Sequence, residues 1–127
     1  MRFAAVIIGG GLGSLLRYAV SGAVQSRVGA IFPYGTLCVN LAGCFVIGFL
    51  WTLFEQTSVR PETRLFFITG LLGGFTTFSS FGMETFNLLR DGETVRAAVN
   101  FAVTNIAGFG CVFAGVISSR ALFALFK

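Results

Sequence analysis

The chain contains four long stretches without a charged residue, and these constrain its fold more than any other feature. They cover residues 3–16, 28–54, 65–83 and 97–119. A bilayer core about 30 Å thick needs about 20 apolar residues in a helix. The last three stretches have or approach that length, and the first reaches it if Arg17 is included. The sequence therefore predicts an all-α integral membrane protein, with spans at about 3–26, 31–54, 65–89 and 97–122 of one domain, residues 1–127.

The composition excludes several classes of soluble protein. Hydrophobic residues make up 55% of the 127 residues and charged residues 11%, whereas about 25% of an ordinary soluble domain is charged. The basic residues are scattered singly, so no nucleic-acid-binding surface is indicated and no nucleic-acid partner is expected. The chain has no histidine, so it offers no nucleophile–histidine pair and an enzyme is the least favoured class. Cys38, Cys44 and Cys111 lie in apolar stretches, which is typical of small buried side chains.

The distribution of basic residues predicts how the chain inserts. With four spans, one face of the membrane holds Arg2, Arg60, Arg64, Arg120 and Lys127, and the other holds Arg17, Arg27, Arg90 and Arg96. Because the Lys/Arg bias sets orientation, a count of five against four predicts insertion in both directions. Oppositely inserted copies would pair as an antiparallel, dual-topology homodimer. A single fixed orientation with a weak bias is the alternative.

Small residues spaced four apart predict close helix packing. Gly9 and Gly13 form one such pair in the first span, and Gly70 and Gly74 form another in the third. The fourth span carries Ala107, Cys111 and Gly115 at the same spacing. Such spacing lets membrane helices approach closely, within a chain or between copies.

The third span contains an unfavourable helix centre. Gly73 and Gly74 are followed by Thr76 and Thr77, and both glycine and β-branched threonine are poor helix formers. A break here would free backbone carbonyls, which at membrane depth must be buried in protein or line a polar cavity. Carbonyl oxygens are also ligands for small hard cations. A structural cation site is therefore one hypothesis for this segment.

The residues around this break carry candidate anion-binding groups. Phe75, Phe78 and Phe81 recur every three residues, which predicts that they share one side of a helix. The positive edge of an aromatic ring solvates an anion weakly, and the hydroxyls of Thr76, Thr77, Ser79 and Ser80 offer stronger donors. Weak, multiple donors suit an ion that must be dehydrated and still leave. The simpler alternative is that the phenylalanines face lipid or pack in the core.

Polar residues in the other spans extend this hypothesis. Thr36 and Asn40 lie one turn apart and therefore share a helix face. An asparagine in a membrane helix serves either as an anion donor or as an interhelical hydrogen bond. Arg17 is either functional or directed to the interface. Glu84 follows Ser80 by one turn and either ends a polar track or sits at the interface.

Three sequence segments resemble one known family. They read GGFTTFSSF at residues 73–81, GTLCVNL at 35–41 and GGGLGSLLR at 9–17. Together they resemble the Fluc family of fluoride channels, also called CrcB, and the similarity extends over essentially the whole chain. The resemblance implies a dual-topology homodimer of four-helix subunits, with two fluoride pores and a central sodium ion as its structural cofactor.

The resemblance also implies roles for individual residues. Phe78 and Phe81 would contact fluoride edge-on, with Asn40 as a donor and Thr36 as its polar neighbour. Ser79, Ser80 and Glu84 would form a polar track, and Arg17 would attract anions at the pore mouth. The backbone carbonyls of Gly73 and Thr76 would hold sodium together with the same atoms of the antiparallel partner.

Two positions depart from the family pattern. Ser80 stands where threonine is common, but it keeps a hydroxyl. Phe101 stands where the fourth span often carries tyrosine, and it has no hydroxyl, which weakens the expectation that this span lines the pore. The roles of Asn100 and Asn105 stay open between interhelical bonds and ligands.

The sequence therefore predicts a passive fluoride channel in the bacterial cytoplasmic (inner) membrane. Its expected partners are the fluoride ion, the lipid bilayer and a second copy of the chain. A small dual-topology, proton-coupled multidrug exporter is the main alternative, but it needs an ionisable group deep in the membrane, and Glu84 is off-centre. A non-transporting membrane scaffold is a third possibility.

Overall fold

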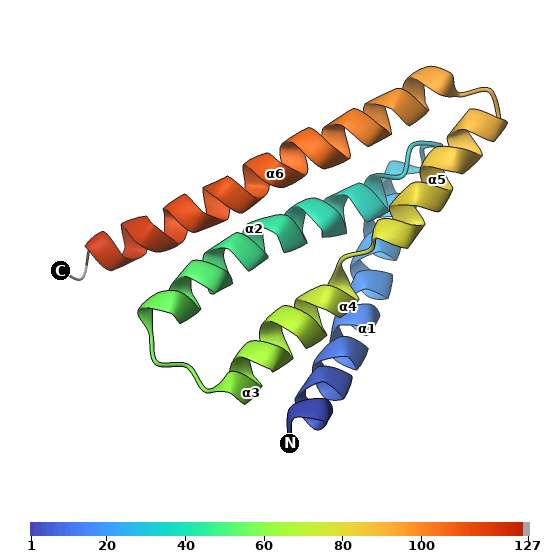
Figure 1. The fold of residues 1–127 in the computed structure, drawn as a ribbon. Coiled ribbons are helices and arrows are strands. Elements are labelled where there is room, and N and C mark those ends of the chain that lie inside the picture. Colours follow the sequence, from blue (N-terminus) through green and yellow to red (C-terminus); the bar gives the residue numbers. More distant parts are fainter. Residues whose placement is uncertain (126–127) are drawn as a thin grey trace.

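The computed structural model describes residues 1–125, so Lys127, counted above, lies outside the described residues. The chain folds into four long helical segments (Figure 1). Three are continuous helices: α1 (Arg2–Val28), α2 (Tyr34–Gln56) and α6 (Thr94–Ala124). The other consists of α3 (Pro61–Arg64), the π-helix η1 (Leu65–Leu72), α4 (Gly73–Phe75) and α5 (Phe78–Arg90). The all-α prediction is confirmed for the described residues, and the largest error in a boundary is the start of the third span, predicted at Leu65 and found at Pro61.

The helix ends have local causes. Gly29 adopts a left-handed conformation (φ 59°) and ends α1, because glycine alone enters that region without steric cost. Pro61 occupies the first turn of α3, where its missing N–H has no partner to lose. Gly92, with φ 81°, lies in the turn between α5 and α6. The connections between α1 and α2, between α2 and α3, and between α5 and α6 are short.

The helices associate in two pairs (Figure 1). One pair is α1 with η1 and α4, and the other is α2 with α6. At the start of both helices, Arg2 of α1 lies 3.9 Å from Glu62 of α3. The segment α5 leaves the first pair after the break and packs against α6. The two pairs are joined by this contact and by the direct packing of α1 against α2.

Glycines let these pairs pack backbone to backbone. A Cβ atom added at Gly9 would lie 2.5 Å from the carbonyl oxygen of Phe66, and one added at Gly70 would lie 3.0 Å from the Cα of Gly9. Gly115 of α6 packs in the same way against α2, where an added Cβ would lie 2.8 Å from the nitrogen of Phe49. The predicted small-residue faces are confirmed as packing faces, and they act within one chain.

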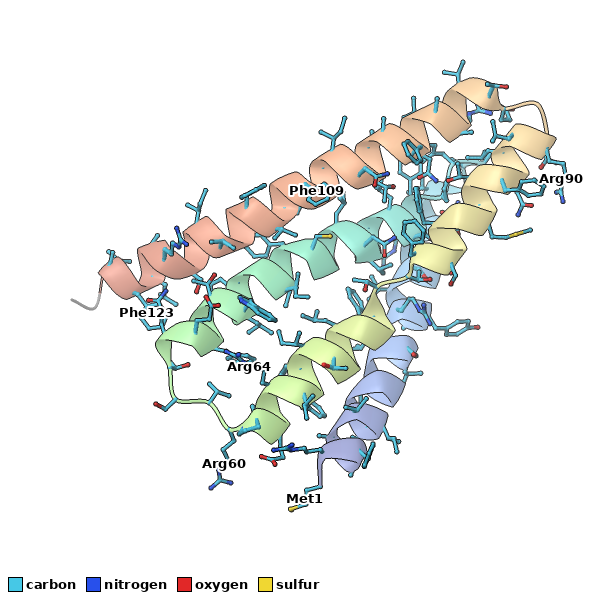
Figure 2. The ribbon with its side chains drawn as sticks, viewed as in Figure 1. Met1, Arg60, Arg64, Arg90, Phe109 and Phe123 are labelled. Atoms are coloured by element: carbon cyan, nitrogen blue, oxygen red, sulfur yellow. The ribbon has the colours of Figure 1, made fainter. Side chains whose placement is uncertain are left out.

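Large apolar side chains cover the outside of the molecule. Ile7, Ile106 and Ile117 are 72%, 74% and 65% exposed. Figure 2 shows Arg60 and Arg90 at opposite ends of the bundle. All four helical segments are long and apolar enough to cross a membrane. The chain is a multi-pass membrane protein whose exposed apolar side chains are suited to lipid.

The third span is interrupted at Thr76 and Thr77. Both residues have extended backbones, with φ −83° and ψ 159° at Thr76 and φ −151° and ψ 114° at Thr77. Gly73, by contrast, keeps helical dihedral angles. The predicted break is confirmed, and the threonines form it. The prediction that Phe75 shares one helix side with Phe78 and Phe81 is wrong, because the break separates α4 from α5 and ends the helical periodicity.

Candidate functional site

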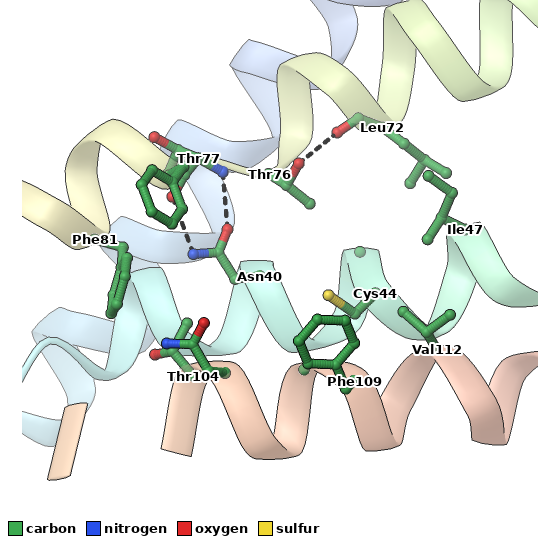
Figure 3. A pocket seen from close by; sticks show the side chains of 14 residues that line it. Asn40, Cys44, Ile47, Leu72, Thr76, Thr77, Phe81, Thr104, Phe109 and Val112 are labelled. Carbon is green, nitrogen blue, oxygen red and sulfur yellow. Dashed lines mark hydrogen bonds between the residues drawn. The ribbon is translucent and has the colours of Figure 1, made fainter. Parts of the chain in front are cut away.

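Asn40 of α2 docks onto the break in the third span. Its side-chain Nδ2 donates to the carbonyl oxygen of Thr77 at 3.0 Å, and its Oδ1 accepts from the Thr77 N–H at 2.8 Å (Figure 3). Both bonds are buried. The amide therefore replaces the helical partners that Thr77 loses by being extended. A primary amide has two N–H groups, and the second makes no hydrogen bond within residues 1–125.

Hydroxyl groups cluster at the start of α5. Thr77 is the N-cap, and its Oγ1 accepts from the N–H of Ser80 at 3.2 Å. The same hydroxyl lies 3.0 Å from Oγ of Ser80 and 3.3 Å from Oγ of Ser79. Thr77 thus satisfies one free N–H of the helix start and brings three hydroxyls together. The fourth predicted hydroxyl, that of Thr76, lies outside this cluster and donates to the Leu72 carbonyl at 3.0 Å.

The two carbonyls proposed for sodium lack their usual helical donors. In a continuous helix, the Gly73 carbonyl would accept from Thr77 and the Thr76 carbonyl from Ser80. Here those two N–H groups bond instead to Asn40 Oδ1 and to Thr77 Oγ1. Within residues 1–125 no backbone N–H donates to the Thr76 carbonyl. Two carbonyl oxygens without these donors suit a hard cation, but they are too few to surround one.

In the described part of the chain, no group of three His, Cys, Asp or Glu side chains comes together that could hold a metal ion. Any cation at the break would therefore rely on backbone oxygen. That chemistry favours hard ions over transition metals, which prefer nitrogen and sulfur ligands.

The two phenylalanines of α5 have different environments. Phe81 is 4% exposed and Phe78 is 80% exposed. Their ring centroids lie 5.4 Å apart at an angle of 58°. Phe101 of α6 stacks on Phe81, with centroids 6.3 Å apart and an angle of 28° between the rings. Phe81 is thus fixed in the core, while Phe78 extends from it.

A cavity of about 360 Å³ joins these groups (Figure 3). Its lining includes Asn40, both residues of the break, and the two α5 phenylalanines. No charged residue lines it. The lining also includes α6 residues, namely Thr104, Asn105, Gly108, Phe109 and Val112. The α6 helix therefore lines this cavity, although the absence of a hydroxyl at Phe101 had weakened that expectation.

A second cavity, of about 330 Å³, lies near the start of α2. Thr36 and Glu84 line it together with Ser21 and Gln25. The Thr36 hydroxyl donates to Oε1 of Glu84 at 2.7 Å, which links α2 to α5. The other Glu84 oxygen, Oε2, is buried without a partner in the described residues. Glu84 thus has one oxygen that accepts a hydrogen bond and one buried oxygen that does not.

Some predicted site residues line the two cavities, whereas Arg17, Ser79 and Ser80 line neither. Asn40 and Thr36 face α5 from the same side of α2, as their spacing predicted, and both are 9% exposed. Arg17 lines neither cavity, and within residues 1–125 it has no ion pair. Its role at a pore mouth stays a prediction.

Sequence reasoning missed the structural role of two residues. Thr77 was noted for its hydroxyl, but its backbone is what Asn40 binds. The Thr-x-x-Ser spacing from Thr77 to Ser80 is a helix-start pattern that could have indicated the cap. Gln25 was not singled out, yet its Nε2 donates to the carbonyls of Ala30 and Phe32 and its Oε1 accepts from Gly35. No local pattern indicates those bonds.

Comparison with known proteins identifies close relatives. The profile of a family described as CrcB-like protein, Camphor Resistance (CrcB), matches residues 4–116. A protein of Desulforapulum autotrophicum named fluoride-specific ion channel FluC is 45% identical over 120 residues, covering 94% of this chain and 96% of the relative. Proteins with the same name from Parabacteroides distasonis and Aquifex aeolicus are 44% and 46% identical, over 96% and 93% of this chain and 95% and 96% of theirs.

Proposed function

This chain belongs to the CrcB family, and on that premise we propose that it is a fluoride-selective passive ion channel of the bacterial cytoplasmic membrane. Fluoride enters cells from acidic surroundings as neutral HF and ionises inside, where the anion is trapped. A downhill exit route lowers its concentration and its toxicity. The observation that carries the proposal is the uncharged cavity where Asn40, the α5 phenylalanines and the hydroxyls of the break meet.

The chemistry of that cavity suits a small anion. One N–H of Asn40 is held by Thr77, which orients the amide so that the second N–H can serve the ion. The rings of Phe78 and Phe81, tilted by 58°, offer positive edges. The Thr77 hydroxyl lines this cavity, and the hydroxyls of Ser79 and Ser80, which do not line it, lie 3.3 and 3.0 Å from Thr77 Oγ1. Because no residue of the lining carries a positive charge, the ion is bound weakly enough to leave, as conduction requires.

The second cavity is proposed as the vestibule. Thr36 and Glu84 are hydrogen-bonded there, and they would continue the polar track from the α5 hydroxyls. A carboxylate repels an anion unless it is engaged by donors or protonated, so the Thr36 bond is part of how the track tolerates fluoride. Arg17 is proposed to attract anions to the membrane surface.

We infer that two copies of the chain assemble as an antiparallel, dual-topology homodimer. The balanced distribution of basic residues supports insertion in both directions. The half-buried Thr104 and Asn105 line the larger cavity at membrane depth, where polar groups need protein or water around them. A second copy packed there would enclose the pore.

A sodium ion is proposed at the centre of this dimer. The carbonyls of Gly73 and Thr76, whose usual helical donors bond elsewhere, would supply four oxygens from two copies, and the ion would act as a structural support at the breaks. Sodium that binds only the assembled protein stabilises it by RT ln(1 + [Na⁺]/Kd), about 2.7 kcal/mol at 100 times Kd. Replacing sodium by N-methylglucamine should therefore lower the unfolding temperature of the purified protein, and an unchanged temperature would contradict the sodium site.

Fluoride efflux from liposomes tests the channel function. Vesicles that contain the purified protein and are loaded with potassium fluoride should release fluoride on addition of valinomycin, and chloride-loaded vesicles should not release chloride. Efflux no faster than from protein-free vesicles would refute the proposal. The exporter alternative instead requires proton-driven uptake of cationic drugs that Glu84→Gln abolishes. A scaffold would leave any flux unchanged in Phe78→Ile and Phe81→Ile.

A further inference from the structure

The covalent connection to α4 does not by itself fix the orientation of the helix α5. It carries both Phe78 and Phe81, and it follows two extended residues. A break in a helix removes the backbone bonds that would transmit the rotation of α4 to α5. The Asn40–Thr77 pair holds the start of α5. A second attachment is required to fix its rotation and height against α6.

Asn100 of α6 supplies that attachment. Its side chain is buried at 2% exposure, and its Nδ2 donates to Oγ1 of Thr85 at 2.9 Å. The Thr85 hydroxyl in turn donates to the carbonyl oxygen of Phe81 at 2.7 Å. The hydroxyl of Thr104 lies 3.5 Å from Oδ1 of Asn100. The series of bonds that starts at Asn100 therefore ends on the backbone of the buried phenylalanine.

Within residues 1–125 this is the one side-chain hydrogen bond between α5 and α6. Phe81 also stacks on the ring of Phe101, the residue that follows Asn100. The α6 helix thus holds Phe81 at two points, its backbone through Asn100 and one ring face through Phe101. With one face covered and Phe78 tilted against it, an edge of the Phe81 ring remains for the cavity that it lines.

We propose that Asn100 is a positioning residue for fluoride permeation, which acts through Thr85 to set the angle at which Phe81 presents its edge to the ion. This inference rests on the proposed channel function. Asn100 does not line either cavity, so it acts without touching fluoride. A ring rotated away from edge-on presents its negative face to the anion. Loss of the Asn100 bond should therefore slow each channel and weaken its discrimination between fluoride and chloride.

The test compares Asn100→Leu, Thr85→Val and the double variant with a matched control. Ser119→Ala removes another fully buried polar group of α6, one whose hydroxyl has no partner within residues 1–125. Single-vesicle efflux separates two quantities: the fraction of vesicles that release fluoride, which reports folded protein, and the rate constant per active vesicle, which reports the pore. Reversal potentials in fluoride and chloride give the selectivity.

We expect each single variant to lower the rate constant about tenfold, the change that corresponds to about 1.4 kcal/mol, within the range for one lost hydrogen bond. The double variant should be no slower than the singles, because both remove the same connection. Ser119→Ala should keep the wild-type rate and selectivity.

Several results would overturn the inference. Asn100→Leu with fewer active vesicles but a wild-type rate constant and selectivity would assign Asn100 to folding alone. Additive effects in the double variant would mean that Asn100 and Thr85 act separately. If Asn100→Leu yields too little protein, Thr85→Val decides by the same criteria. Failure of wild-type protein to pass fluoride would instead remove the proposed function itself, and that result is distinguishable from the others.

Discussion

Asn40 provides the sharpest test of how this chain maintains a broken helix in a membrane. Replacing it with alanine removes two buried hydrogen bonds and leaves the N–H and carbonyl of Thr77 without partners. A buried polar group left unsatisfied costs about 1–3 kcal/mol, so two such groups cost about 2–6 kcal/mol. Ordinary interhelical hydrogen bonds in membranes average only about 0.6 kcal/mol each, or about 1.2 kcal/mol for two.

The cost of about 2–6 kcal/mol applies if the break cannot close into a regular helix after Asn40 is replaced. Two extended residues span about 6.6 Å, and two helical residues span about 3.0 Å. Closing the break would therefore pull α5 by about 3.6 Å along α6. That movement would separate Phe81 from Phe101 and Asn100 from Thr85, which now pack or bond across the two helices. We accordingly expect Asn40→Ala to lower the free energy of unfolding by about 2–6 kcal/mol.

Reversible unfolding in mixed micelles of increasing SDS content measures this quantity, at fixed protein concentration because the folded form is proposed to be a dimer. The fluorescence of Trp51, the single tryptophan, reports the transition. Asn87→Ala is the matched control, since Asn87 lines neither cavity and its Oδ1 has no partner within residues 1–125. A loss of 1.2 kcal/mol or less for Asn40→Ala would refute the reasoning, because the break would then close or find other partners without Asn40.

Three further predictions test other parts of the structure. Phe78→Ile should lower fluoride efflux more than about tenfold while the unfolding free energy changes by less than about 0.5 kcal/mol, because this side chain is 80% exposed; unchanged efflux would remove Phe78 from the pore. Gly9→Ala should destabilise the protein by about 1–3 kcal/mol through overpacking against η1. The control Gly11→Ala, with no atom within 4 Å of the added Cβ, should be neutral or stabilising by up to about 1 kcal/mol. Equal effects of the two variants in SDS unfolding would contradict the packing. Gln25→Ala removes three hydrogen bonds and should lower the free energy of unfolding by about 1.5 kcal/mol, the lower end for three partly exposed bonds. Hydrogen exchange at the Gly35 N–H should become faster. Unaltered exchange would show that Gln25 does not hold the α1–α2 connection.

The sequence by itself determined the number of spans, the position of the break and the face shared by Thr36 and Asn40. These features depend on local properties: the length of apolar runs relative to the bilayer, the poor helix propensity of adjacent glycines and threonines, and the 3.6-residue period of a helix. The family resemblance of residues 73–81 was also visible without a structure.

Only the tertiary structure decided which partner each polar group finds. The docking of Asn40 on Thr77, the separation of Phe75 from Phe78, the attachment of Phe81 to Asn100, and the participation of α6 in the cavity all depend on how helices distant in the sequence rotate and cross. A hydrogen bond requires its two atoms within about 3.2 Å. Periodicity places a residue on a face, but only packing brings two faces to that distance.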